Sequence, residues 1–284
     1  MRSCKTVFTI CMQNIRKWSK DYRIWCVAIL LLTITQIYVD DVRDIADYLN
    51  AKVSVWIFPF MYSQYYTKLI FIMPVILLFC NAPFIDDNQV YVYVRAGKRK
   101  WIAGLLLYII IASALYYLYL IIISVLSLSL HGTFDADWGN VLYTIAESGI
   151  ASHRGRYFVN VSSMILDYFT PMQAIWFTFL VSWSHAVLIG FIIFACNYLT
   201  KLKYLGLSIS SIIIIFSMFL EHHGYPGLMN FSPSSWVTLD RIDIGGRTTN
   251  PSFLYCMLFY WISIFIITLI IYLFSSKKSF DFRR

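Results

Sequence analysis

Six long stretches of apolar residues alternate with polar segments along the chain. A helix needs about 20 mainly apolar residues to cross about 30 Å of hydrocarbon, and its backbone polar groups must bond within the helix. The stretches that reach or approach this length cover residues 24–39, 66–80, 101–130, 172–200, 204–220 and 253–274. The pattern predicts an all-α integral membrane protein, with six transmembrane helices in a single transmembrane domain over residues 1–284.

The second stretch is the least regular of the six. Residues 53–80 are mostly apolar, but Pro59 and Pro74 interrupt them, and residues 63–68 are largely polar. Because irregular backbone is not tolerated facing lipid, we expect the outer part of this stretch to lie in the interface or to re-enter the membrane. The amino group of Lys68 should then extend to the outer headgroups.

The segment before the first stretch combines apolar and basic residues. Lysines and arginines lie among apolar residues that recur at near-helical spacing, namely Val7, Ile10, Cys11, Ile15 and Trp18. This pattern predicts that residues 1–23 form a cytoplasmic, amphipathic interfacial helix on the inner leaflet, where basic residues meet anionic headgroups. An ordinary basic flank next to the first span explains the pattern equally well.

The segments expected outside differ in length. Residues 40–52 are acidic and place four apolar side chains on one helical face: Val42, Ile45, Ala46 and Leu49. Residues 131–171 and 221–252 are longer and rich in turn formers. We expect these two segments to form small outer caps.

Composition and charge support this interpretation. The chain is 59% hydrophobic and 13% charged, whereas soluble domains carry about 25% charged residues, so a water-soluble enzyme is excluded. The segments 1–23, 81–100, 201–203 and 275–284 hold 16 Lys and Arg with 4 acids, while the remainder holds 7 and 11. Because positive loops stay in the cytoplasm, both termini are expected inside. This asymmetry accounts for the pI of 9.1 without nucleic acid as a partner.

Motifs for covalent chemistry are missing. Gly97-Lys98 is the only Gly-Lys pair, and Val92 stands where a P-loop needs its first glycine. No His-Glu-x-x-His motif occurs, and the six cysteines show no Cys-x-x-Cys spacing. Glu221, His222 and His223 form one dense cluster, which we interpret as a water-exposed helix end. We therefore expect no catalytic residues, no metal and no cofactor in this chain.

One ionisable residue lies near the centre of a predicted span. His185 shares a helical stripe with Thr178 and Ser182, which could line a polar passage. A hydrogen bond from His185 to a neighbouring helix is the simpler interpretation, because no acid accompanies it within a span. Thr178, Ser182, Ala186 and Gly190 also place a small residue at every fourth position, which predicts a close-packing face within the bundle or across a dimer.

The segment 81–100 is the main expected cytoplasmic surface. Its candidate docking residues, with the aromatic residue that follows, are Asp86, Asp87, Tyr91, Tyr93, Arg95, Lys98, Arg99 and Trp101. Carboxylates, amphipathic aromatic rings and cations suit contact with a partner protein. For Lys98–Lys100 the simpler explanation is that they orient the next span. Acids contribute little to orientation, so Asp86 and Asp87 favour polar contacts.

The chain resembles the permease subunits of type-2 ABC exporters. Three features carry the resemblance: the amphipathic stretch 7–18, six spans with both ends inside, and the loop 81–100. In that family this loop contains a coupling helix that seats in the ATPase. The family's early acid resembles Asp86 or Asp87, and its Arg, basic turn and aromatic residue resemble Arg95, Gly97–Arg99 and Trp101. Residues 90–94, VYVYV, depart from the pattern because they are poor helix formers.

The resemblance implies a transmembrane subunit that forms a path with a second permease copy, in a homo- or heterodimer, within the bacterial cytoplasmic membrane. ATP and Mg would be bound by a separate ABC ATPase subunit, and the cargo would be a peptide, a bacteriocin or a hydrophobic molecule. The alternative is a non-transporting immunity or sensory protein that binds a toxin or partner through its outer caps. Ion-coupled transport is disfavoured by the lack of carboxylates in the predicted spans.

Overall fold

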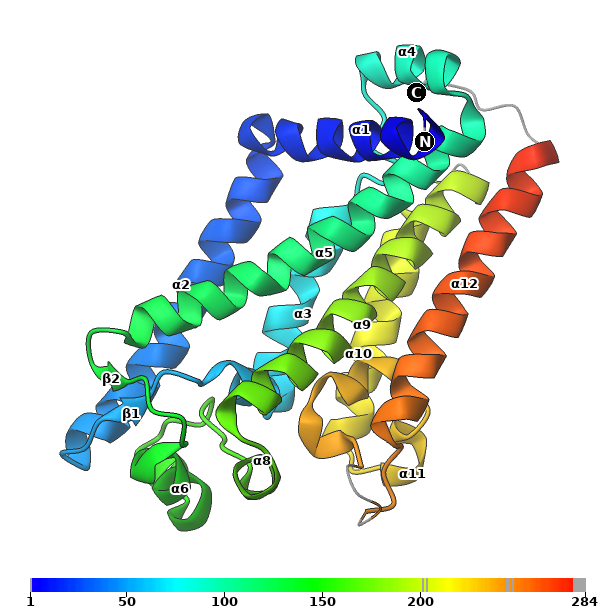
Figure 1. The fold of residues 1–284 in the computed structure, drawn as a ribbon. Coiled ribbons are helices and arrows are strands. Elements are labelled where there is room, and N and C mark those ends of the chain that lie inside the picture. The colour runs from blue at the N-terminus through cyan, green and yellow to red at the C-terminus, as the bar shows by residue number, and fades with distance from the viewer. Residues whose placement is uncertain (1, 201, 203, 244–245, 247, 278–284) are drawn as a thin grey trace.

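The computed structural model describes residues 2–200, 202, 204–243, 246 and 248–277. Its first helix, α1 (Arg2–Arg16), runs across one end of a helical bundle (Figure 1). A short 3₁₀ turn, η1 (Lys17–Lys20), leads to α2 (Tyr22–Tyr48), whose first turn is capped by the Asp21 carboxylate accepting from the Arg23 N–H. A carboxylate suits this position because helix N-termini carry unpaired N–H groups and positive partial charge.

Five described helices are long and apolar enough to cross a membrane. They are α2, α5 (Lys98–Leu128), α9 (Pro171–Thr200), α10 (Leu205–His222) and α12 (Phe253–Lys277). Each covers most or all of one predicted stretch. The prediction of an all-α chain with several helices of membrane-spanning length is therefore confirmed.

The second predicted span forms a shorter helix, α3 (Tyr65–Phe79). At 1.5 Å per residue, its 15 residues extend only about 22 Å, which is less than the hydrocarbon thickness. The preceding residues form the short strand β1 (Val53–Ser54) and the buried 3₁₀ helix η2 (Phe58–Tyr62), which has Pro59 at its start. This irregular backbone is covered by the protein itself, which is how such backbone is tolerated near a membrane.

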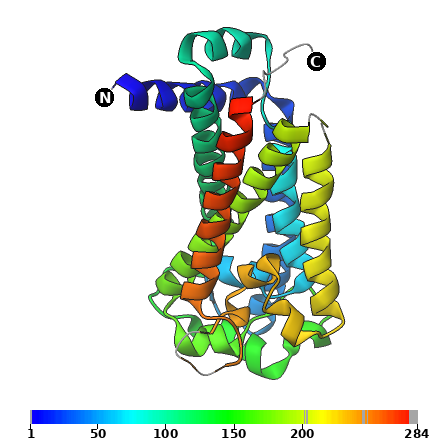
Figure 2. The same ribbon diagram turned by 90° about the vertical axis from the view of Figure 1, so that its right-hand side faces the viewer.

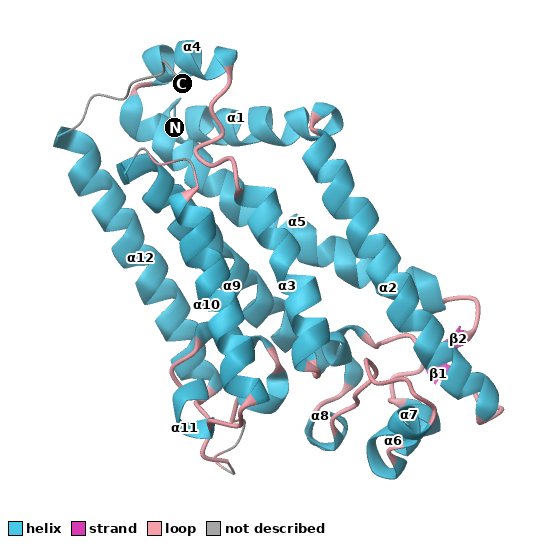
Figure 3. Ribbon diagram, turned by 180° about the vertical axis from the view of Figure 1, so that it is seen from behind, coloured by secondary structure: helices cyan, strands magenta, loops and turns pink. Residues whose placement is uncertain are grey.

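Small elements gather at the end of the bundle opposite α1 (Figure 3). The strand β1 pairs in parallel with β2 (Gly132–Thr133). The same end also holds α6 (Gly139–Ser148), α7 (Ile150–His153), α8 (Ser163–Tyr168), α11 (Pro226–Met229), η3 (Pro233–Val237) and η4 (Leu239–Arg241). We call this region the α6/α8 end. It contains both predicted caps.

The acidic segment 40–52 is largely a continuation of α2 and not a separate connection. The helix ends at Tyr48, and Val42, Ile45 and Ala46 are buried on its inner face. Arg156, from the loop after α7, pairs with Asp41 at 2.9 Å and also with Asp44. The helix therefore extends past the predicted span because its apolar face continues and its acidic face meets a cation.

The bundle has α9 at its centre and α12 at its side. In the most apolar 18-residue stretch of each helix, 78% of α9 is buried but only 17% of α12. The helix α4 (Asp87–Ala96) lies at the same end of the bundle as α1 and the C-terminal part of α12 (Figures 1 and 2). We call this the α1/α4 end.

The N-terminal helix is amphipathic, and part of its apolar face is directed at the protein. Ile10 and Cys11 are buried, and Gly104 of α5 lies so close that a Cβ there would be 2.7 Å from Ile10. The Trp18 indole donates to the Tyr108 hydroxyl at 2.9 Å. The apolar pattern of residues 7–18 thus reflects packing on α5, which fixes α1 across the bundle.

Candidate functional site

The predicted docking segment contains a complete helix, α4, at the α1/α4 end. The Asp86 carboxylate caps it by accepting from the Gln89 N–H at 3.0 Å. At its other end the Gly97 N–H donates to the Tyr93 carbonyl at 2.9 Å, with Gly97 at φ +79°. These two caps stabilise a helix across residues 90–94 despite their low helix propensity, since tertiary packing overrides propensity.

Buried hydrogen bonds attach α4 to two other helices. The Trp101 indole, at the start of α5, donates to the Gln89 Oε1 at 2.6 Å, and the Gln89 Nε2 donates to the Asn14 Oδ1 of α1 at 3.4 Å. Gln89, Asn14 and Trp101 are all buried. At the edge of this contact, Lys17 pairs with Asp86 at 2.5 Å. Movement of α4 would therefore displace α1 and the start of α5.

The opposite face of α4 is exposed and partly apolar. Tyr91 is 72% exposed and Val94 is 75% exposed, and Arg95 beside them is exposed as well. Tyr91, Val94 and Arg95 share one face because residues three and four apart are neighbours on a helix. This face, which we call the α4 face, is available to a partner.

The structure separates the predicted docking residues into two groups. Tyr91, Arg95 and Arg99 are exposed, whereas Trp101 is fully buried and Tyr93 packs against it with ring centroids 5.5 Å apart. Burial raises the pKa of the Tyr93 hydroxyl.

Two further members of the set, Asp86 and Lys98, make contacts within the chain. Asp86 caps the helix and pairs with Lys17, and the Lys98 ammonium donates to the Ser275 carbonyl at the end of α12. The side chain of Asp87 lies outside the described part of the structure. The surface open to a partner is thus narrower than the sequence suggested.

Gln89 and Asn14 were not identified from the sequence. Gln89 stands three residues after a capping Asp, a spacing typical of helix starts, so a helix beginning at residue 87 could have been inferred. Its contact with Asn14 could not, because the two residues are 75 positions apart.

The small-residue stripe of α9 lies inside the bundle. Thr178, Ser182, Ala186 and Gly190 are all buried. A Cβ at Gly190 would stand 2.5 Å from Ile109 of α5 and 3.0 Å from Phe79 of α3. The small residues therefore allow three helices to approach closely.

His185 lies in the same buried stripe. Its Nε2 is 2.9 Å from the Ser234 hydroxyl of η3, so its partner belongs to the cap and not to a spanning helix. Its Nδ1 and the hydroxyls of Thr178 and Ser182 have no hydrogen-bond partner among the described residues.

Two predictions about the α6/α8 end are wrong. Lys68 does not extend to a headgroup region, and Glu221 is not part of a water-exposed helix end. Their side chains are only 5% and 6% exposed, and they form an ion pair that joins α3 to α10. Each charge offsets part of the desolvation cost of burying the other. The adjacent His222 and His223 are exposed.

This ion pair also weakens the reason given against ion-coupled transport, which was the lack of carboxylates in the predicted spans. The helix α10 extends to His222, so a carboxylate does lie within a helix long enough to span. Ser217 is 3.5 Å from the Glu221 Oε1 and 2.9 Å from the Ser235 hydroxyl. The charge is thus paired and hydrogen-bonded in a cross-link between α3, α10 and η3.

Among the described residues, no group of three or more His, Cys, Asp or Glu side chains is placed to hold a metal ion. No protein-family model, curated protein or solved structure matches this chain.

Proposed function

We propose that this chain is the transmembrane subunit of an ATP-driven export system, coupled to a separate ABC ATPase through α4. A second permease copy would complete the translocation path, and ATP with Mg would be bound by the ATPase. The cargo would be a peptide, a bacteriocin or a hydrophobic molecule. The membrane would be the bacterial cytoplasmic membrane, with the α1/α4 end inside.

The observation that carries this proposal is the combination of an exposed face and a fixed base in α4. The α4 face presents an aromatic, an aliphatic and a cationic side chain, which suit the centre and rim of a protein interface. The other side is fixed to α1 and α5 through Gln89. A partner that moves α4 would therefore also move α5, a helix of 31 residues.

The first experiment is affinity purification of the tagged chain from its native membrane, with mass spectrometry and an ATPase assay of the eluate. A co-purifying P-loop protein is expected. Tyr91→Ala and Arg95→Glu should reduce its recovery, because both side chains belong to the α4 face. Tyr157→Ala is the matched control, since Tyr157 is an exposed tyrosine at the other end of the bundle.

Recovery of the chain without any ATPase would contradict the export proposal. Recovery of the ATPase at the same yield with both α4 variants would contradict only the docking face.

A second candidate is a non-transporting immunity or sensory protein that binds a partner or toxin through the caps. The α6/α8 end favours it, because this end holds an open cavity whose walls are joined by hydrogen bonds. A lone chain in the purification, together with capture of a toxin by the intact chain, would support this candidate.

A further inference from the structure

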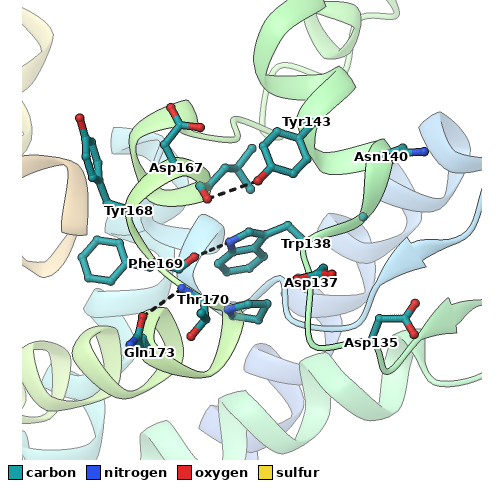
Figure 4. A pocket seen from close by; sticks show the side chains of 13 residues that line it. Asp135, Asp137, Trp138, Asn140, Tyr143, Asp167, Tyr168, Phe169, Thr170 and Gln173 are labelled. Atoms are coloured by element: carbon teal, nitrogen blue, oxygen red, sulfur yellow. Dashed lines mark hydrogen bonds between the residues drawn. The ribbon is translucent and has the colours of Figure 1, made fainter.

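A cavity of about 660 Å³ opens at the α6/α8 end, between the segment leading into α6 and the junction of α8 with α9 (Figure 4). This volume lies within the 300–1,000 Å³ typical of small-molecule sites. No residue predicted to be functional lines it. The cavity therefore requires an explanation separate from α4 and from the α9 stripe.

The cavity has an apolar floor and an acidic rim. Trp138, Leu166, Phe169 and Pro171 line it and are buried. Three exposed carboxylates also line it, Asp135 and Asp137 before α6 and Asp167 in α8, so acids come from two of its walls. None of these carboxylates has a hydrogen bond or ion pair to another side chain within the described residues.

Hydrogen bonds between the walls hold the cavity open in one shape. The Trp138 indole donates to the Phe169 carbonyl at 2.7 Å, and the Tyr143 hydroxyl donates to the Leu166 carbonyl at 3.4 Å. The Gln173 Oε1 accepts from the Thr170 N–H at 3.1 Å. The bonds of Trp138 and Tyr143 join the two walls, and the bond of Gln173 fixes the start of α9. A ligand would therefore meet a site that is already formed, which lowers the entropic cost of binding.

The net charge of the cavity lining is negative even when the partial positive charge of the nearest helix N-terminus is included. The N-terminus of α9 begins at Pro171, in the cavity wall, and a helix N-terminus carries roughly half a positive charge. One carboxylate would balance that charge, and the site has three. The lining contains no Lys or Arg.

We infer that this cavity binds an organic cation with an apolar body, such as a quaternary ammonium compound or the arginine side chain of a peptide. The apolar body would cover the buried floor, and the positive group would lie among the rim carboxylates and near the ring of Tyr143, which also lines the cavity. Aromatic faces attract cations through their quadrupole. This binding requires neither the ATPase nor export, so it can be tested independently of the proposed function.

The test is calorimetric titration of the full-length chain in lipid nanodiscs. One arm uses benzyltrimethylammonium chloride, with benzyl alcohol as the neutral comparison. A second arm uses acetyl-Arg-Tyr-amide, with acetyl-Gln-Tyr-amide as its neutral comparison. We expect only the cations to bind, with affinity falling as salt rises because the carboxylates are solvent-exposed. The stronger of the two arms identifies a small molecule or a peptide as the source of the cation.

The variant is the double replacement Asp137→Asn with Asp167→Asn, which removes one carboxylate from each wall. We expect its dissociation constant for the cation to rise roughly three- to tenfold, as the loss of two solvent-exposed ion pairs would give. Glu147→Gln is the matched control, because Glu147 is an exposed carboxylate on α6 that does not line the cavity. Equal melting temperatures of the variants would show that the fold is retained.

Three outcomes would overturn the inference: no binding of either cation at millimolar concentration, equal binding of the neutral compounds, or an unchanged dissociation constant in the double variant. None of these outcomes bears on the recovery of an ATPase, so failure here is distinguishable from failure of the export proposal.

Discussion

At the scale of single residues, the ion pair of Lys68 and Glu221 joins two helices within the protein interior. Both side chains are almost completely buried. Removing one partner of such a pair costs about 3–5 kcal/mol, because the remaining charge is left without compensation, whereas removing both together can be nearly neutral.

We therefore expect Lys68→Met to lower the free energy of unfolding by about 3–5 kcal/mol, and Lys68→Met combined with Glu221→Gln to recover most of this loss. Denaturant titration in mixed micelles would measure both. Lys52→Met, at an exposed lysine, serves as control and should change the stability by less than about 0.5 kcal/mol. A double variant no more stable than Lys68→Met would show that the pair is not the cause.

Gly190 sets the separation of three helices. Because a Cβ at this position would meet Ile109 at 2.5 Å, Gly190→Ala should destabilise the chain by about 1–3 kcal/mol through overpacking. Gly227 has nothing within 4 Å of such an atom, so Gly227→Ala is the matched control. Thermal unfolding followed by circular dichroism compares the two, and equal melting temperatures would argue against close packing at Gly190.

At the scale of elements, one buried glutamine joins α4 to two other helices by hydrogen bonds. Gln89→Ala would remove the hydrogen bond that the buried Trp101 indole donates to Gln89 and the one that Gln89 donates to the Asn14 Oδ1. The Asn14 Oδ1 would keep its contact with Lys17 at 3.5 Å, and a lost hydrogen bond costs about 0.5–1.5 kcal/mol. We expect faster hydrogen exchange of the α4 backbone, measured by mass spectrometry. Asn88→Ala, at the adjacent exposed amide, should leave the exchange unchanged. Slow exchange in both variants would mean that other contacts hold α4.

The helix α3 shows how neighbours set the length of an element. Its apolar sequence favours a helix, but η2 precedes it as a buried 3₁₀ turn and not as a continuous α-helix. The buried aromatic side chains Phe58, Phe60 and Tyr62 hold that turn in the cap. Buried, irregular backbone followed by a short helix is therefore the stable arrangement of this part of the chain.

At the scale of the whole molecule, the placement of α4 and the cavity at opposite ends predicts opposite sides of a membrane. In a chain whose six native cysteines are replaced, Asn140→Cys should react with an impermeant maleimide in intact cells. Tyr91→Cys should react only after permeabilisation. Both positions are exposed, so accessibility in the protein does not limit labelling. Labelling of both from outside would contradict a spanning bundle, and the reversed pattern would contradict an intracellular partner for α4.

The amino-acid sequence by itself determined that the chain is mainly helical and where its long apolar stretches lie. These properties depend on local composition and on residues three or four apart. It also located the α4 segment through its charge. Only the tertiary structure decided that Lys68 meets Glu221, that Gln89 joins α4 to α1, and that Asp137 and Asp167 share a cavity. Such contacts join residues tens to hundreds of positions apart, and no local periodicity encodes which distant side chain becomes the neighbour.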